Sequence, residues 1–290
     1  MRRLMIVTAA VVGMLAATPA TAAANSNRLF NDSTLVAKDR FSVEVVGRGP
    51  DVVLIPGLAS SRATYRRTAT ALRDHYRVHL IQVAGFAGEP AGANASGPVF
   101  DPLVDGVSAY VKSLGRPVPV IGHSLGGTLG LAIAERHPGL MSKLLIVDSL
   151  PFYGVVLGGP TANVATLRPI VDGIRSRPAQ AQSPEAARGM ASYMITAPAD
   201  VDRVVGWMQA SDPKVVVTAM TDDMLADLRP ELAAVTTPVT VLYETPLKPM
   251  VESGYATLKG AKLIEVPNAK HFIMDDQPAR FDAEVATFLK

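Results

Sequence analysis

A serine stands between two glycines at positions 122, 124 and 126, in the pattern Gly122-x-Ser124-x-Gly126. The β-branched run at residues 118–121 predicts a strand, and residues 127–137 predict a helix. A serine on such a sharp strand-to-helix turn exposes its hydroxyl, and the glycines leave room where a Cβ would not fit. The pattern therefore predicts that Ser124 is a nucleophile for acyl transfer.

A nucleophilic serine needs a general base, which is nearly always a histidine. In a doubly wound sheet the base comes from a loop after a late strand, and His271 is the only histidine beyond residue 137. We therefore predict that His271 is the base. The other histidines are expected beside the nucleophile, at helix ends or inside a strand: His123, His75, His137 and His79.

The base in turn needs a carboxylate that fixes its tautomer, and two candidates fit the chain order. Asp148 ends the strand after the serine helix, and Glu244 ends the strand before the last one. An aspartate at a strand end often only caps a turn, whereas the Thr245-Pro246 turn restricts how Glu244 is presented. We favour Asp148 and keep Glu244 as the rival acid. Four other aspartates are interpreted as solvated surface charges: Asp222, Asp223, Asp275 and Asp276.

Two backbone N–H groups are candidates for an oxyanion hole. Leu125 follows the nucleophile, so its N–H can face the developing oxyanion. Gly57 allows a sharp turn after the early strand at residues 52–55, so the N–H of Leu58 can face the same space.

The elements that must position these residues alternate as strand and helix, which predicts a parallel sheet with helices on both faces. The strands are expected at residues 41–46, 51–55, 78–83, 118–121, 143–147, 238–243 and 262–266. From 152 to about 235 the rhythm changes to Ala, Met and helix-start signals, which predicts a helical lid. Trp207 and Met208 are candidate substrate contacts in it, although packing of the lid explains them equally well. The core is then residues 41–151 and 236–290.

Residues 1–24 have the pattern of a signal peptide, with Arg2 and Arg3, an apolar run and small residues before a cleavage site. We expect a periplasmic or secreted bacterial protein, with an uncleaved anchor as the alternative and no stable membrane span after cleavage. Removal of the leader leaves 26 basic and 26 acidic residues, which predicts no nucleic-acid partner. The chain has no cysteine, which excludes disulfides and thiolate sites, and neither a metal nor an organic cofactor is implied.

From about residue 41 to its C-terminus, the chain resembles the α/β-hydrolase superfamily. The resemblance rests on Gly122-His123-Ser124-Leu125-Gly126-Gly127, on Pro56-Gly57, and on His271-Phe272 followed by Asp276-Gln277-Pro278 and Phe281. It implies an α/β fold with an eight-stranded, mostly parallel, doubly wound sheet, a Ser-acid-His triad and a lid inserted after the sixth strand.

The chain departs from the superfamily pattern in two places. Many members carry His-Gly in place of Pro56-Gly57, and most place the acid after the penultimate strand in a Gly-x-x-Asp setting. That setting is absent around Glu244, and some members place the acid after the sixth strand, where Asp148 stands.

The expected function is an exported serine hydrolase that cleaves a carboxylic ester or a related acyl bond of a small molecule. Amide, lactone, thioester or carbon–carbon bond cleavage and a non-catalytic ligand-binding protein are the alternatives. The motifs do not separate these reactions, and they say nothing of the oligomeric state.

Overall fold

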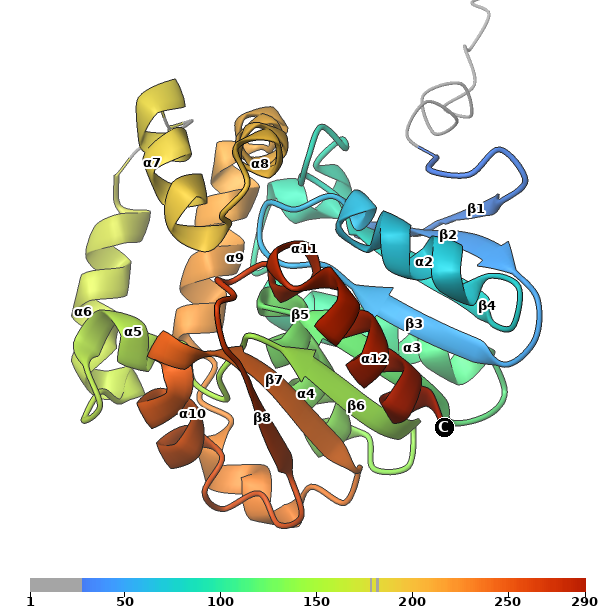
Figure 1. Ribbon diagram of the computed structural model, residues 1–290. Helices are drawn as coiled ribbons and strands as arrows, with labels where there is room; N and C mark the ends of the chain where they lie inside the picture. Colours follow the sequence, from blue (N-terminus) through green and yellow to red (C-terminus); the bar gives the residue numbers. More distant parts are fainter. Residues whose placement is uncertain (1–27, 178, 181–182) are drawn as a thin grey trace, which may run out of the picture.

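An eight-stranded sheet forms the centre of the protein (Figure 1). The structure is a computed structural model that describes residues 28–177, 179–180 and 183–290, so the predicted leader lies outside the described residues. The strand order is β1-β2-β4-β3-β5-β6-β7-β8; β2 is antiparallel to both neighbours, and all other pairs are parallel. The strands are β1 (Thr34–Ala37), β2 (Phe41–Gly47), β3 (Asp51–Ile55), β4 (Arg77–Val83), β5 (Val118–His123), β6 (Met141–Val147), β7 (Val239–Glu244) and β8 (Lys262–Val266). The predicted fold class is confirmed.

Each face of the sheet buries its own hydrophobic core, because successive side chains of a strand point to opposite faces. The helices of the body are α2 (Arg66–Leu72), α3 (Phe100–Ser113), α4 (Leu125–Arg136), α10 (Lys248–Gly254), α11 (Ile273–Asp276) and α12 (Pro278–Leu289). In β3, Val53 and Ile55 join the core under α3, α4 and α10, whereas Val52 and Leu54 join the core under α2 and α12. Helices on both faces leave the carboxyl ends of the parallel strands as the edge where catalytic loops can meet.

Between β6 and β7, the described residues form five α-helices, which make up the lid at the upper left of Figure 1. They are α5 (Gly154–Gly158), α6 (Val164–Arg175), α7 (Pro184–Met194), α8 (Pro198–Ala210) and α9 (Pro213–Leu225). Asn163, Ser183 and Asp212 cap the starts of α6, α7 and α9 through their side chains, and α7 to α9 each have a proline in the first turn. These caps explain why residues 215–217, a strand-like Val-Val-Val run, are helical.

The lead-in before residue 41 is more ordered than the sequence predicts. Residues 25–39 read as irregular, but Thr34–Ala37 form edge strand β1, in which Thr34 pairs with Val45. This strand is only four residues long, and none of its side chains is fully buried, so it carries little hydrophobic pattern.

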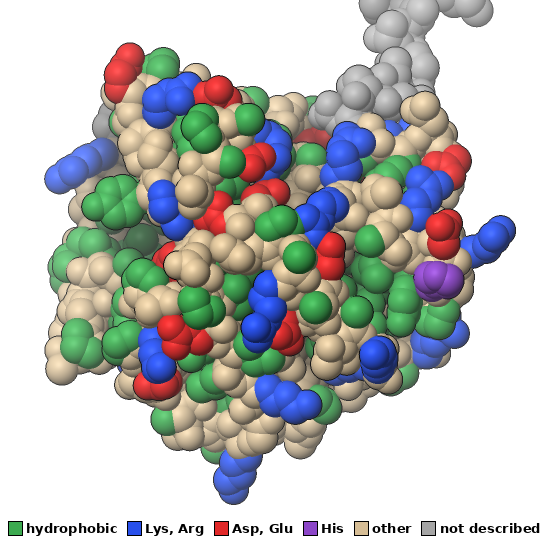
Figure 2. Space-filling model, in the orientation of Figure 1, with side chains coloured by type: hydrophobic (Ala, Val, Ile, Leu, Met, Phe, Trp, Pro, Cys, Tyr) green, Lys and Arg blue, Asp and Glu red, His purple; other side chains and the backbone are tan. Residues whose placement is uncertain are grey.

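The surface mixes both signs of charge on the face drawn in Figure 2. Hydrophobic side chains gather at the left edge of that face, where α5 and α6 lie, and Val156, Leu157 and Ile170 of these helices are about half exposed. Within the described residues, no helix is both long and apolar enough to cross a membrane.

Candidate active site

Ser124 lies at the sharp turn between β5 and α4, with φ 52° and ψ −125°. This left-handed conformation is strained for a residue other than glycine, and such strain is concentrated at functional sites. A Cβ at Gly122 would lie 2.2 Å from Gly126 O, and one at Gly126 would lie 2.2 Å from Ile55 O. The two glycines are thus required by the close approach of the turn to itself and to β3.

Asp148 follows the last residue of β6 and adopts φ 49°. Its fully buried carboxylate accepts a hydrogen bond from His271 Nδ1 at 2.7 Å through Oδ2. Its second oxygen, Oδ1, accepts one from the backbone N–H of Glu244 at 2.8 Å. A carboxylate held in this way fixes the tautomer of His271, because Nδ1 carries the proton and Nε2 is left as the basic nitrogen.

Glu244, the rival acid, meets Asp148 through its backbone. In the described part of the chain its carboxylate forms no hydrogen bond with His271. Burial, and then the negative charge of Asp148, raise the pKa of Glu244 to about 7. Of the two carboxylates, Asp148 is the one that the structure pairs with His271.

His123, which the sequence places beside the nucleophile, supports His271. Its Nε2 donates a hydrogen bond to His271 O at 2.9 Å, and the two rings lie 4.6 Å apart between centroids. Burial lowers the pKa of His123 far below its ordinary value, and the charge of His271 lowers it further, so the ring stays neutral. Sequence reasoning missed this role, and the signal for it is the histidine in the Gly-x-Ser-x-Gly pattern itself.

Tyr153, a residue that sequence reasoning did not single out, lies close enough to Ser124 for the serine hydroxyl to influence the pKa of its phenol. Burial raises the pKa of Tyr153, and the negative charges of Asp148 and Asp223 raise it further, so the phenol stays protonated. No hydrogen bond joins Ser124 to His271 within the described residues. Catalytic hydrogen bonds of this kind often form only once substrate is bound.

Leu58 and Leu125 lie on the two segments that meet at Ser124. A Cβ at Gly57 would lie 3.0 Å from Ser124 Cβ, so the loop after β3 passes directly beside the nucleophile. Among the described residues, neither the N–H of Leu58 nor that of Leu125 takes part in a hydrogen bond. Their binding of a developing oxyanion stays a prediction.

The lid contacts the loops of the active site. Phe272 N donates to Met194 O at 3.0 Å, and Asp276 accepts hydrogen bonds from Thr196 N and Lys270 N, each at 2.9 Å. These contacts join the end of α7 and the α7–α8 connection to the segment that carries His271.

The candidate lid residues Trp207 and Met208 lie on α8, partly buried against the core under α2 and α12. The Trp207 ring lies 5.2 Å from the Arg203 guanidinium. Their contact with substrate stays a prediction.

The interpretation of four aspartates as solvated charges is wrong, because all of them face other elements. Asp223 is the clearest case: it is 7% exposed, and one oxygen, Oδ1, has no hydrogen-bond partner in the described chain. Asp275 pairs with Arg203, and Asp222 accepts from Val99 N at 2.7 Å. The sequence did not reveal this, because the inward faces of α9, which carries Asp222 and Asp223, and of α11, which carries Asp275 and Asp276, depend on how the helices pack.

Two open cavities, of about 590 and 460 Å³, lie beside the lid. Neither cavity is lined by Ser124 or His271. The lining of the smaller one includes Leu150, which follows Asp148 by two residues. In the described part of the chain, no group of three or more His, Asp or Glu side chains is arranged to hold a metal ion.

Comparison with known proteins identifies the fold family. Residues 52–284 match the model of the Alpha/beta hydrolase family, which is most of the chain. The chain belongs to this alpha/beta hydrolase family. The resemblance read from the sequence and the expectation of a hydrolase are thereby confirmed.

Relatives of this alpha/beta hydrolase include two enzymes named pimeloyl-[acyl-carrier protein] methyl ester esterase. The one from Vibrio cholerae is 34% identical over 108 residues, which is 37% of this chain and 40% of that protein. The one from Methylococcus capsulatus is 30% identical over 134 residues, 46% of this chain and 50% of that protein. The matched stretches thus span at most half the length of these relatives.

Solved structures share the fold. An enol-lactonase from Burkholderia xenovorans LB400 has a TM-score of 0.70 at 18% identity, covering 86% of this chain and 96% of that one. A thermophilic esterase from Thermogutta terrifontis has a TM-score of 0.71 at 19% identity, covering 88% and 98%. At such low identity these likenesses concern the fold alone.

Proposed function

We propose that this alpha/beta hydrolase is an exported serine esterase in which Ser124, His271 and Asp148 form the catalytic triad. One observation carries the proposal: His271 is paired through Nδ1 with the buried Asp148 carboxylate at 2.7 Å, and its backbone O accepts a hydrogen bond from His123, the residue before the strained Ser124. The methyl ester esterases among the relatives support an ester as the bond that is cleaved.

In the acylation half of the reaction, Ser124 Oγ attacks the ester carbonyl carbon while His271 Nε2 takes the hydroxyl proton. Asp148 stabilises the imidazolium that forms. The N–H groups of Leu58 and Leu125 bind the oxyanion, and His271 then gives its proton to the leaving alkoxide. The products are a free alcohol and an acyl-Ser124 ester.

In the second half, water attacks the acyl carbon and gives a proton to His271. Collapse of the second tetrahedral intermediate returns that proton to Ser124 and releases the carboxylic acid. Before attack, the Ser124 hydroxyl must form a hydrogen bond with His271 Nε2, because the base has to reach the hydroxyl proton.

The substrate that we propose is a small ester whose acyl part is apolar and of small to medium size, in keeping with the Met and Trp side chains of the lid. A panel of ester, thioester, lactone and amide substrates tests this reaction class. Hydrolysis of esters with little activity on amides supports the proposal. Preferred cleavage of another bond would contradict it.

Export is proposed from Arg2, Arg3 and the apolar run that follows them. We expect the full-length chain, expressed in a Gram-negative host, to reach the periplasm with a new N-terminus after Ala22 or Ala24. Fractionation with N-terminal sequencing checks this. Recovery of the intact Met1 chain from the cytoplasm would contradict it.

The catalytic role of the serine is tested by labelling purified protein with a fluorophosphonate probe, with Ser124→Ala as the control. Labelling of the wild type that is lost in the variant supports the proposal. A folded wild type that neither reacts with the probe nor cleaves esters would favour the ligand-binding alternative.

A further inference from the structure

The loop that carries Leu58 is strained and needs support from outside itself. It leaves β3 at Pro56, and Ala59 adopts φ 53° within it. Its own backbone contributes a single long hydrogen bond, from Ser60 N to Gly57 O at 3.3 Å. An oxyanion donor must be held within a few tenths of an ångström, so other groups have to fix this loop.

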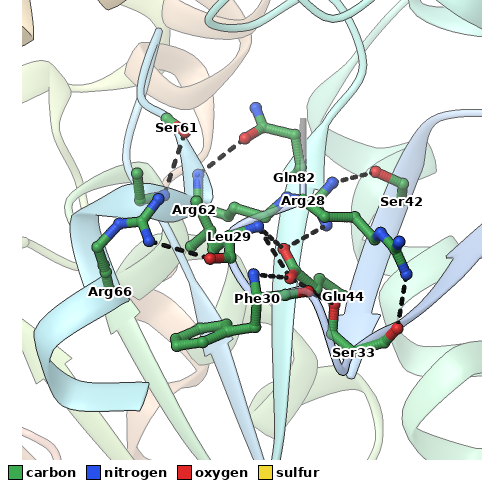
Figure 3. A network of polar contacts seen from close by, with 11 residues as sticks. Arg28, Leu29, Phe30, Ser33, Ser42, Glu44, Ser61, Arg62, Arg66 and Gln82 are labelled. Atoms are coloured by element: carbon green, nitrogen blue, oxygen red, sulfur yellow. Dashed lines mark hydrogen bonds and ion pairs between the residues drawn. The ribbon is translucent and has the colours of Figure 1, made fainter. Parts of the chain in front are cut away.

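Gln82 of β4 holds the end of the loop. Its buried side chain accepts a hydrogen bond from Arg62 N at 2.8 Å, which Figure 3 shows. It also donates one to Ser60 O at 3.3 Å. One amide thus connects to the backbone of the loop on both sides of Ser61.

Arg62, which ends the loop, is itself almost fully buried, at 2% exposure. Its guanidinium donates to Ser42 Oγ, and Nη1 lies 3.7 Å from a carboxylate oxygen of Glu44. Burial lowers the pKa of Arg62, and the charge of Glu44 is the largest influence opposing that shift. A buried guanidinium is costly unless it is paired, so the position of Arg62 depends on Glu44.

Glu44 is completely buried, and its carboxylate accepts hydrogen bonds from the first residues that the structure describes. Leu29 N donates to both of its oxygens, at 2.9 and 2.8 Å, while Phe30 N (2.9 Å) and Ser33 Oγ (2.6 Å) donate to Oε1. Figure 3 shows the residues around this carboxylate converging from the N-terminal segment and from the loop. Without this segment, three of the donors of a buried charge are lost, which is strongly unfavourable.

From this chain of contacts we propose that the segment Arg28–Ser33 is a positioning element of the active site. The segment donates hydrogen bonds to the Glu44 carboxylate, and this carboxylate fixes Arg62. Together with Gln82, the segment thereby holds the loop that presents the N–H of Leu58 to the oxyanion. The inference rests on the proposed function, since it assigns these residues to the geometry of the transition state and not to substrate binding.

Loss of the network is expected to lower kcat and to leave KM nearly unchanged, because the oxyanion forms only in the transition state. Removing one oxyanion donor outright costs about 100-fold or more, so displacing it should cost about 10-fold or more. We expect such a loss for Glu44→Gln, for Gln82→Met and for deletion of residues 25–33. Ser33→Ala is the mild variant, expected to fold even if the others do not, with a loss of a few-fold.

Asp51→Asn is the matched control. Asp51 is also a buried carboxylate with several donors, from Arg77, His79 and Arg116, but it lies at the opposite end of β3 from the loop. It should lower Tm without lowering kcat. If the role of Glu44 were merely structural, Glu44→Gln would resemble Asp51→Asn and lower Tm without lowering kcat.

The experiment measures kcat, KM, Tm and the hydrogen exchange of residues 57–62 in all variants. Faster exchange of the loop and a lower kcat in the Glu44, Gln82 and Ser33 variants, but not in Asp51→Asn, is the expected result. Unchanged exchange and kcat in those variants would overturn the inference. Because loop exchange does not depend on turnover, an inactive wild type would contradict the proposed function separately.

Discussion

Two carboxylates lie at the carboxyl edge of the sheet beside His271, and they meet the catalytic machinery through different atoms. Asp148 contacts the imidazole through its side chain, whereas Glu244 contributes its backbone N–H to Asp148. Since a substitution of Glu244 keeps that N–H, the two positions should respond very differently to the removal of charge.

Asp148→Asn should lower kcat by about 10³- to 10⁴-fold, because an amide no longer fixes the tautomer that leaves Nε2 basic. Glu244→Gln should stay within a few-fold of the wild type. Steady-state kinetics on one ester, with circular dichroism to confirm folding, checks both. A large loss in Glu244→Gln with an active Asp148→Asn would reverse the assignment of the acid.

Asp223 makes stability depend on pH. Burial raises its pKa from 3.8 to about 7, so between these values the folded state holds more protons than the unfolded state. The free energy of unfolding therefore falls as pH rises through this window and is level above it.

Asp223→Asn removes that contribution. From pH 5 to pH 8, the variant should gain about 2 kcal/mol of stability relative to the wild type. Urea unfolding of both proteins at the two pH values measures the difference. A difference that is the same at both pH values would show that Asp223 ionises normally in the folded protein.

The strand-to-helix turn is the element that the sequence predicted best, since its glycines and its β-branched run are local signals. The seven strands predicted from the sequence all exist. The antiparallel strand β2 shows an alternating pattern, and buried parallel strands such as β3 show continuous apolar runs. β1 was missed because it is short and has no fully buried side chain. The inward-facing groups of the lid, Asp223 and Tyr153, could not be found, because they depend on how separate helices pack.

The close packing of the Ser124 turn against β3 can be tested by substituting a glycine of the turn. Gly126→Ala would place a Cβ 2.2 Å from Ile55 O, a backbone atom that cannot move aside, so the variant should lose activity and at least about 2 kcal/mol of stability. Gly173→Ala in α6 is the control, since nothing lies within 4 Å of its Cβ. It should be stabilising by about 0.5–1 kcal/mol.

Thermal unfolding and ester hydrolysis of the two glycine variants decide this point. An active Gly126→Ala of normal stability would mean that the turn is not as tightly packed as the structure has it.

At the scale of the whole molecule, the sheet brings together residues that are far apart in the sequence. Ser124, Asp148 and His271 follow β5, β6 and β8, and parallel strands place all three at one edge. That edge could be predicted from the strand pattern, and the late histidine followed from it. The choice between Asp148 and Glu244 could not, because both end strands at the same edge and only the side-chain direction separates them.

The buried network behind the Leu58 loop is also a property of the whole molecule. It links Glu44 of β2, Gln82 of β4 and the segment before β1, which no local pattern connects. Sequence reasoning treated that segment as irregular, because its donors are mainly backbone N–H groups that carry no sequence signature.

The most direct test of the account is to identify the residue that reacts with a fluorophosphonate probe. We predict a single adduct by intact mass spectrometry of the wild type, mapped to the peptide that contains Ser124 and absent in Ser124→Ala. An adduct on another residue, or no adduct on a folded wild-type protein, would contradict the claim that Ser124 is the nucleophile of a serine hydrolase.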